Sequence, residues 1–256
     1  MFLCNKRPMA EPIKTAIQFT IVAIMVTILL ESWKPVNTYA VFLEKSPLFS
    51  LYLPIHCKNM KESLNIDCLI PCAGLSERMG SWKPMIDYRG RPLIVQVVEK
   101  ALSPCQRVIL VTGYRGEELE ELFALESRVD CVRNREYGRG MFSSIQRGVS
   151  SVRTPAFFVS LGDMPEIPAD IFQTLSKLLD EHPEADIARP LHHGRPGHPV
   201  LLRKTVVPTI LDLPAESNMQ EVFRRHQNST GQRVIEIAVS SPGTIYDIDR
   251  REDLAD

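Results

Sequence analysis

Pro71-Cys-Ala-Gly-Leu-Ser-Glu-Arg-Met-Gly-Ser-Trp-Lys83 is the segment of the chain that most clearly indicates its fold. The short apolar run 66–71 leads into it and is typical of a buried strand. The stretch itself holds two glycines, which let backbone N–H groups approach phosphate oxygens, together with an arginine and a lysine that supply positive charge. The sequence therefore predicts a phosphate-binding loop at the carboxyl end of a first strand.

The spacing within this loop excludes two common nucleotide-binding motifs. Gly74 and Gly80 do not fit the Gly-x4-Gly-Lys-Ser/Thr pattern of P-loop NTPases, and they do not fit the Gly-x-Gly-x-x-Gly pattern of Rossmann dehydrogenases. By itself, such a loop is also an ordinary connection between a strand and a helix. The segments around it have to decide between these interpretations.

Strand-like and helix-like segments alternate after residue 60, which predicts an α/β fold: a single Rossmann-like, three-layer domain with a mostly parallel sheet. The predicted strands are 66–71, 107–112, 129–132, 156–161, 186–189, 199–202, 234–239 and 244–248, and the predicted helices are 93–101, 117–125, 142–149 and 168–179. Ligands of such folds bind at the carboxyl ends of the strands. The loops that carry Gly74, Gly113, Gly140 and Asp163 all leave such ends.

The overall composition excludes some classes of partner. The 256 residues are 44% hydrophobic and 24% charged, as in an ordinary soluble globular protein, and the formal net charge is -1. A net charge this close to zero gives no overall electrostatic attraction toward nucleic acid or an anionic membrane. A bound polyanion therefore needs a local site. Cysteines stand at positions 4, 57, 68, 72, 105 and 131, without a Cys-x-x-Cys pair or a zinc-type histidine cluster. Free thiols in a reducing compartment, the cytoplasm, are the simplest interpretation.

The N-terminal region departs from this picture. Residues 16–30 are apolar and follow Lys6, Arg7 and Lys14, which is typical of a signal peptide or a short membrane anchor. A third interpretation is that Met60, which precedes a polar lead into the first strand, is the natural start, and we favour this one. We therefore divide the chain into an N-terminal appendage, residues 1–60, and a domain of residues 61–256, and we expect membrane contact only if the appendage is retained.

Residues 71–83 resemble the signature Ala-Ala-Gly-x-Ser-x-Arg-Met-Gly-x-x-Lys of the MobA-like nucleotidyltransferases, above all the molybdenum cofactor cytidylyltransferases. Five further segments resemble this family in the family's order: Leu110-Val-Thr-Gly-Tyr-Arg115, Gly140-Met-Phe-Ser-Ser-Ile145, Gly162-Asp-Met-Pro165, Gly197-His-Pro199 and Asp247-Ile-Asp249. The resemblance covers nearly all of residues 66–254. It implies a nucleotide-diphospho-sugar transferase type of domain that transfers CMP from CTP to the phosphate of molybdenum-molybdopterin and releases pyrophosphate.

The resemblance also implies roles for single residues. It makes Arg78, Lys83 and Asp163 the catalytic residues, and Asp163 and Asp249 the ligands of Mg²⁺, a hard ion that takes oxygen ligands. For Asp249 a helix N-cap is the alternative, and Asp247 is a weaker metal candidate. The implied nucleotide-binding residues are Cys72, Ala73, Gly74, Leu75, Ser76, Gly80, Lys83, Gly113, Ser143 and Ser144. For the two serines an N-cap role is equally ordinary.

Gly197, His198 and Pro199 occupy the place where the family presents a residue toward the second substrate. A structural role for His198 stays open, and His192, His193 and Arg195 precede it on the same loop, where they could help to hold an anionic pterin phosphate.

Two departures from the family pattern bear on the substrate. Cys72 replaces the usual alanine and is small enough to keep the backbone geometry. The loop reads Pro-Cys-Ala-Gly, whereas guanylyl-transferring relatives carry Leu-Ala-Gly-Gly, so we expect CTP rather than GTP. Two alternatives remain. One is another nucleotidyltransferase of the same fold, which uses GTP or has a sugar-phosphate or alcohol-phosphate acceptor. The other is a chaperone that passes the cofactor to an apo molybdenum hydroxylase without catalysis.

Overall fold

The computed structural model describes residues 64–76, 81–227 and 233–254. The predicted appendage 1–60 with its apolar run 16–30, and the loop residues Arg78 and Gly80, lie outside these ranges, so the predictions made for them stay predictions. No helix in the described ranges has the length and apolar character needed to cross a membrane.

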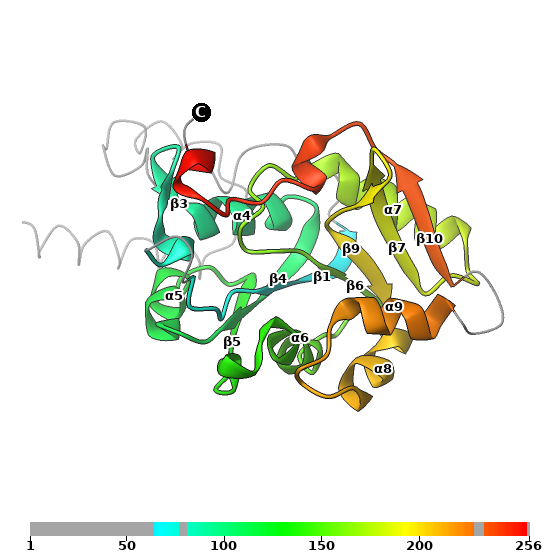
Figure 1. The fold of residues 1–256 in the computed structure, drawn as a ribbon, viewed down its shortest axis with the longest axis horizontal. Coiled ribbons are helices and arrows are strands. Elements are labelled where there is room, and N and C mark those ends of the chain that lie inside the picture. The colour runs from blue at the N-terminus through cyan, green and yellow to red at the C-terminus, as the bar shows by residue number, and fades with distance from the viewer. Residues whose placement is uncertain (1–63, 77–80, 228–232, 255–256) are drawn as a thin grey trace, which may run out of the picture. The chain divides into compact units, whose positions relative to one another are not determined.

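The strands and helices follow one another along the chain in the alternation that the sequence predicts (Figure 1). The strands are β1 (Leu64–Pro71), β2 (Asp87–Tyr88), β3 (Arg91–Pro92), β4 (Cys105–Thr112), β5 (Val129–Arg133), β6 (Ala156–Val159), β7 (Ile187–His192), β8 (Arg195–Pro196), β9 (Val200–Arg203) and β10 (Val234–Ala238). The α-helices are α4 (Leu93–Leu102), α5 (Gly116–Leu122), α6 (Met141–Val149), α7 (Ala169–Glu181), α8 (Val207–Asp212) and α9 (Met219–Gln227). The short 3₁₀ helices are η2 (Lys83–Met85), η3 (Tyr137–Arg139), η4 (Lys204–Val206), η5 (Pro242–Thr244) and η6 (Arg251–Leu254).

The main sheet runs in the order β10-β7-β9-β6-β1-β4-β5, with β8 paired to β7. Strand β1 pairs in parallel with β4 and β6, β4 pairs in parallel with β5, and β10 pairs in parallel with β7. Among the described residues, each antiparallel pair of this sheet involves β9 or β8: β9 pairs with β6 and β7, and β8 pairs with β7. The prediction of an α/β fold with a mostly parallel sheet is therefore confirmed.

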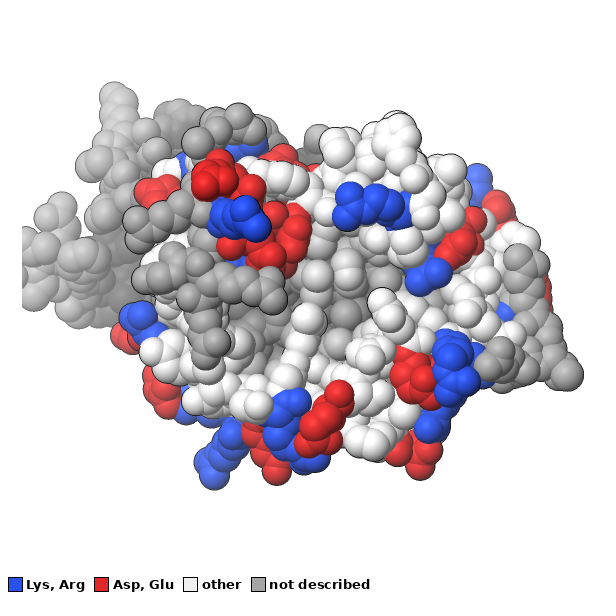
Figure 2. All heavy atoms as spheres, viewed as in Figure 1, with Lys and Arg blue, Asp and Glu red and all other residues white. Residues whose placement is uncertain are grey.

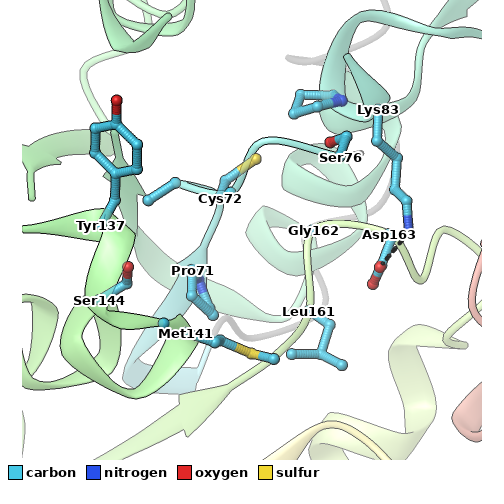
Figure 3. Close-up of a pocket in the computed structure, with 14 residues that line it drawn as sticks. Pro71, Cys72, Ser76, Lys83, Tyr137, Met141, Ser144, Leu161, Gly162 and Asp163 are labelled. Atoms are coloured by element: carbon cyan, nitrogen blue, oxygen red, sulfur yellow. Dashed lines mark hydrogen bonds and ion pairs between the residues drawn. The ribbon is translucent and has the colours of Figure 1, made fainter. Parts of the chain in front are cut away.

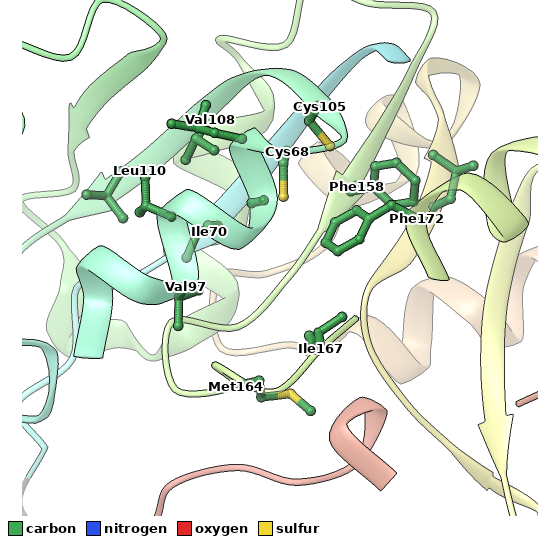
Figure 4. Packing of buried hydrophobic residues seen from close by; sticks show 14 of the residues in the cluster. Cys68, Ile70, Val97, Cys105, Val108, Leu110, Phe158, Met164, Ile167 and Phe172 are labelled. Atoms are coloured by element: carbon green, nitrogen blue, oxygen red, sulfur yellow. The ribbon is translucent and has the colours of Figure 1, made fainter. Parts of the chain in front are cut away.

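Buried side chains on the two faces of the sheet form two separate clusters. Along β1, Cys68 and Ile70 join the cluster that packs against α4 and α7, whereas Leu69 between them joins the cluster that packs against α6, α8 and α9. Figure 4 shows the first cluster, where Phe158 and Phe172 meet edge to face with ring centroids 4.9 Å apart. Because successive strand residues point to opposite faces, the apolar runs of the sequence serve both layers, which gives the predicted three-layer domain.

The structure corrects the expected strand 244–248. This segment starts at the last residue of η5 and then runs outside the sheet, where the Ile248 N–H donates to the backbone oxygen of Asp163 at 2.9 Å and not to a neighbouring strand. Ile248 is fully buried with Tyr88 and Leu93, next to a small β2-β3 hairpin that the sequence analysis did not predict. The hairpin and α4 therefore fix the segment that carries Asp247 and Asp249.

Two helix boundaries also differ from the predicted ones. The predicted helix 117–125 ends earlier, at Leu122, and Leu125 is largely exposed, so no burial favours a further turn. Pro168 is the N-cap of α7 and not a residue of its first turn.

Candidate active site

A cavity of about 300 Å³ opens where the carboxyl ends of β1 and β6 meet the loop before α6. It is lined by Pro71, Cys72, Ala73, Gly74, Ser76, Lys83, Pro84, Tyr137, Gly140, Met141, Ser144, Leu161, Gly162 and Asp163. Figure 3 shows Lys83 and Asp163 at one end of this cavity and Tyr137 and Ser144 at the other. The cavity therefore has a charged end and a neutral end, as a site for a nucleotide triphosphate requires.

Lys83 joins two distant parts of the chain at the charged end. Its Nζ donates to Oδ2 of Asp163 at 2.9 Å and to Oδ1 of Asp249 at 2.7 Å. Burial lowers the pKa of Lys83, but the hydrogen bond to Asp249 and the charge of Asp163 outweigh this effect and raise its pKa above the ordinary value. The lysine is therefore a permanent cation at neutral pH and cannot act as a base.

The carboxylates at this end can also hold a metal ion. Asp163, Asp247 and Asp249 each offer an oxygen atom, and the three oxygens lie within 4.8 Å of one another. Mg²⁺ takes oxygen ligands and is commonly held by one or two carboxylates together with phosphate oxygens and water. The donor set thus fits a hard divalent cation, and it adds Asp247 to the two predicted ligands.

The carboxylate of Asp249 accepts a hydrogen bond from Lys83. Oδ2 of Asp253 accepts the backbone N–H groups of Asp249 and Arg250, at 2.9 and 2.7 Å. Asp163 and Asp249, the two predicted metal ligands, lie close together in space, although the segment 244–248 before Asp249 is not the expected strand.

Two serines and an asparagine form the neutral end. Nδ2 of Asn134 donates to Oγ of Ser143 and to Oγ of Ser144, each at 3.0 Å, and all three side chains are buried. Only Ser144 lines the cavity, and Ser143 donates to the backbone oxygen of Gly140 at 2.7 Å. The alternative of a serine N-cap is wrong, because the N-cap of α6 is Gly140.

Asn134 is a site residue that the sequence analysis missed. It directly follows β5, and its N–H donates to the backbone oxygen of Thr112 at 2.8 Å. A polar residue at the carboxyl end of a parallel strand was the available signal, since ligands gather at that edge.

The first loop forms the wall between the two ends. Cys72, Ala73, Gly74 and Ser76 line the cavity, whereas the side chain of Leu75 is 44% exposed. Burial and the charge of Asp163 raise the pKa of the Cys72 thiol to about 12, so the thiol stays protonated at neutral pH.

Gly113 does not line the cavity, but it lets the first loop approach β4. A Cβ at this position would lie 2.6 Å from Cβ of Ala73 and 2.9 Å from Cβ of Tyr137. The close approach is stabilised by the N–H of Tyr114, which donates to the backbone oxygen of Ala73 at 3.1 Å. Gly113 therefore shapes the site through packing.

Trp82, the residue before Lys83, packs against the loop after β4. Its indole ring is buried, the guanidinium of Arg115 lies 4.7 Å from the ring centroid, and the ring of Tyr114 meets it edge to face at 6.4 Å. A guanidinium over an aromatic face is attractive, so this stack holds η2 and its lysine in place.

His198 stands beside the charged end of the site. Its Nδ1 lies 3.4 Å from the backbone oxygen of Val159, and its backbone N–H donates to the oxygen of Thr244 at 2.7 Å. Burial lowers the pKa of His198, against the opposing effects of the Val159 bond and the charges of Asp163 and Asp247. The imidazole is therefore neutral at physiological pH and reaches the acidic group only at longer range.

Gly197 permits this position of His198, because a Cβ on Gly197 would lie 2.4 Å from the backbone oxygen of Thr244. The earlier histidines of the same region lie differently: His192 is buried with Nδ1 3.1 Å from the backbone oxygen of Val239, and it stacks edge to face on His193. His193 in the β7-β8 turn and Arg195 in β8 are exposed. None of these three residues lines the cavity.

The surface charges agree with a local site. Figure 2 shows acidic atoms gathered over the C-terminal segment that ends in η6, while the rest of this face carries both signs. With a net charge of -1, a polyanionic ligand needs a bound cation or a lysine within the site to offset these carboxylates.

Comparisons with known proteins give concordant results. A family model described as MobA-like NTP transferase domain matches residues 68–230. The molybdenum cofactor cytidylyltransferase of Escherichia coli is 35% identical over 188 residues, which are 73% of this chain and 93% of that protein. A probable molybdenum cofactor guanylyltransferase of a Nostoc species is 25% identical, over 75% of this chain and 89% of that protein. A Methanothermobacter nucleotidyl transferase has the same fold, with a TM-score of 0.62 at 22% identity over 75% of this chain and 94% of that one.

Proposed function

Since this chain belongs to the family of MobA-like NTP transferase domains, we propose that it transfers CMP from CTP to the phosphate of molybdenum-molybdopterin. The products are pyrophosphate and the cytosine dinucleotide form of the cofactor. The family membership and the nucleotidyltransferase activity predicted from residues 71–83 are confirmed by the family match and by the E. coli relative. The choice of nucleotide, of acceptor and of metal is our proposal.

The observation that best supports the proposal is that one end of the cavity is charged and the other end is neutral. Lys83, Asp163 and Asp249 form a charged end that suits a triphosphate with its metal ion, and Ser144 stands at a neutral end that suits a base. The choice of CTP is supported by 35% identity to a cytidylyltransferase against 25% to a probable guanylyltransferase, and by Pro-Cys-Ala-Gly at the start of the loop.

The chemistry requires positioning more than a reactive side chain. The acceptor phosphate is already substantially ionised at neutral pH and attacks the α-phosphorus in line, so no general base is required. Lys83 offsets the negative charge that builds on the leaving pyrophosphate, and Arg78 is proposed to do the same from the loop. Mg²⁺ held by Asp163 and Asp249, with Asp247 nearby, would neutralise phosphate charge.

We place the acceptor beside Gly197, His198 and Pro199. The charges of Asp163 and Asp247 act on the pKa of His198, which supports an acceptor bound on the Asp163 side of the site. A neutral imidazole can give or receive a hydrogen bond without adding charge. The described cysteines, Cys68, Cys72, Cys105 and Cys131, are free thiols, in keeping with the proposed cytoplasmic location.

The decisive experiment incubates the purified chain with molybdenum-loaded molybdopterin, Mg²⁺ and either CTP or GTP, and measures released pyrophosphate. We expect turnover with CTP, loss of turnover when EDTA removes the metal, and recovery when Mg²⁺ is restored. Turnover with GTP alone would contradict the proposed nucleotide. Absence of turnover with both, while the intact cofactor still binds and passes to an apo molybdenum hydroxylase, would identify a chaperone.

A parallel assay compares molybdopterin with other possible acceptor substrates. Sugar phosphates and alcohol phosphates replace molybdopterin at equal concentration, with CTP as the donor. Faster turnover with one of them would contradict the proposed acceptor while leaving the proposed use of CTP intact.

A further inference from the structure

The buried amide of Asn134 has only one possible orientation. One side of the amide faces the backbone N–H of Glu136, at 3.0 Å, and that group can only donate. The atom on this side must therefore be the oxygen, and Nδ2 must face the serines. Since Asn134 is 4% exposed, solvent does not compete for these bonds.

This orientation fixes the role of both serine hydroxyls. Nδ2 of Asn134 donates one hydrogen bond to Oγ of Ser143 and one to Oγ of Ser144, so each hydroxyl oxygen is an acceptor toward the amide. Ser143 in turn donates its proton to the backbone oxygen of Gly140 at 2.7 Å. The Ser144 proton has no protein acceptor within residues 64–76, 81–227 and 233–254, and Ser144 lines the cavity.

We propose that Asn134 is a positioning residue for nucleotide binding, which acts by making the Ser144 hydroxyl a donor toward an acceptor atom of a pyrimidine base, O2 or N3 of cytosine. The inference rests on the proposed function for the identity of the base. The location supports it, because Ser144 stands at the neutral end of the cavity, opposite Lys83 and Asp163 (Figure 3). A buried hydroxyl proton without an acceptor is unfavourable, so a bound base that supplies the acceptor gains affinity.

The first test asks whether loss of the Ser144 hydroxyl weakens CTP binding without slowing turnover. Ser144→Ala removes the donor, and we expect the dissociation constant and KM for CTP to rise about tenfold, with kcat and the KM for the pterin substrate much less affected. Ser143→Ala is the matched comparison: it also removes one bond to Asn134, but its hydroxyl is committed to Gly140. We expect Ser143→Ala to lower the melting temperature and to raise the KM for CTP clearly less.

The second test reverses the direction of the hydrogen bond. Asn134→Asp keeps the shape and still accepts the Glu136 N–H, but at pH 8 its second oxygen accepts a hydrogen bond from the Ser144 hydroxyl, which then presents only lone pairs to the base. We expect an approximately tenfold loss of CTP affinity in the wild-type background. In a Ser144→Ala background the same substitution should lower the CTP affinity by less than about twofold, because the residue through which it acts is absent.

Equal, independent losses from Asn134→Asp in both backgrounds would overturn the inference, because they indicate a purely structural role. Unchanged CTP binding in a folded Ser144→Ala protein would overturn it as well. These outcomes differ from a failure of the proposed function, in which the unaltered chain transfers no CMP. Calorimetric binding of CTP with Mg²⁺ gives a readout that does not depend on turnover.

Discussion

Two groups of charged side chains lie toward opposite ends of the same central strands, and they are built differently. Toward the amino ends, Asp67 of β1 is fully buried and accepts Nε and Nη2 of Arg107, at 3.0 and 2.7 Å, and the backbone N–H of Arg153 at 2.8 Å. At the carboxyl ends, Lys83 bridges Asp163 and Asp249, whose side chains are 26% and 39% exposed.

The difference separates a stabilising cluster from a reactive one. Every oxygen of Asp67 has a donor, and Arg107 also bonds Asp130 and the backbone oxygen of Ser151, so no ligand could add to this network. Around Lys83 the carboxylates outnumber the cation, and Lys83 and Asp163 line a cavity, so a metal ion and a phosphate can replace part of the existing contacts. Charge count and exposure together, rather than the presence of an ion pair, distinguish the site.

Breaking the amino-end cluster should have the largest effect. Arg107→Met leaves the buried Asp67 without its charge partner, and we expect a loss of about 3–5 kcal/mol in the free energy of unfolding. For a domain of this size the melting temperature should fall by about 10 °C, measured by calorimetry. Arg153→Met is the control, because the Arg153 side chain is 76% exposed and 3.6 Å from Asp130. Equal losses in the two variants would contradict the distinction.

Removing the cation at the carboxyl end should affect catalysis instead. We expect Lys83→Met to lower kcat/KM for CTP by about 10²–10³, as for loss of one preorganised charge that stabilises a transition state. The free energy of unfolding should change by less than about 1 kcal/mol, since the partners are partly exposed. Lys177→Met, which removes a surface pair with Glu181, is the control for a lost lysine. A lower melting temperature with unchanged kcat/KM would assign Lys83 to structure.

The pH dependence of stability should follow the amino-end cluster. Burial raises the pKa of Asp67, but the hydrogen bonds from Arg107 and from the N–H of Arg153 outweigh it and lower the pKa below its ordinary value. A depressed folded-state pKa contributes stability above the unfolded pKa of 3.8, and this contribution is lost as pH falls through the folded value. Urea unfolding from pH 7 to pH 2.5 measures the free energy of unfolding of wild type and of Asp67→Asn. The difference between the two free energies should become smaller as pH falls. A difference that is constant with pH would contradict this.

The smallest expected effect concerns Cys72, between the two ends of the cavity. Its pKa of about 12 means that little thiolate exists at pH 8, although Lys83 lies nearby and lowers the pKa in part. Alkylation by iodoacetamide requires the thiolate, so Cys72 should react slowly in the folded chain and readily in urea, as followed by mass spectrometry. Fast labelling in the folded chain would show that the cation activates the thiol.

Much of the fold could be predicted because burial patterns are local. The runs at 66–71 and 107–112 and the helix at 142–149 were recognised from apolar periodicity, and each lies within the observed element. Residues 244–248 were misassigned because an extended apolar segment has the same pattern whether it joins a sheet or packs on a hairpin. Which of the two occurs depends on whether a neighbouring strand pairs with the segment, and that strand would be far away in the sequence.

For the site, the sequence supplied the chemistry but not every member. Lys83, Asp163 and Asp249 were predicted from their resemblance to family motifs, and the structure brings them together. Asn134 escaped prediction because a single asparagine after a strand is common, and its meaning depends on Glu136, Ser143 and Ser144 meeting around one amide.

Most central strands and helices, the first loop and the residue types of a phosphate-handling site follow from the sequence alone, because hydrophobic periodicity and short motifs are encoded within a few neighbouring residues. The position of Lys83 between two carboxylates 80 and 166 positions away follows only from the folded chain, as does the direction that Asn134 gives to the Ser144 hydrogen bond. Such contacts depend on the sheet order and on the packing of Ile248, since distances between remote segments are set only when the core closes.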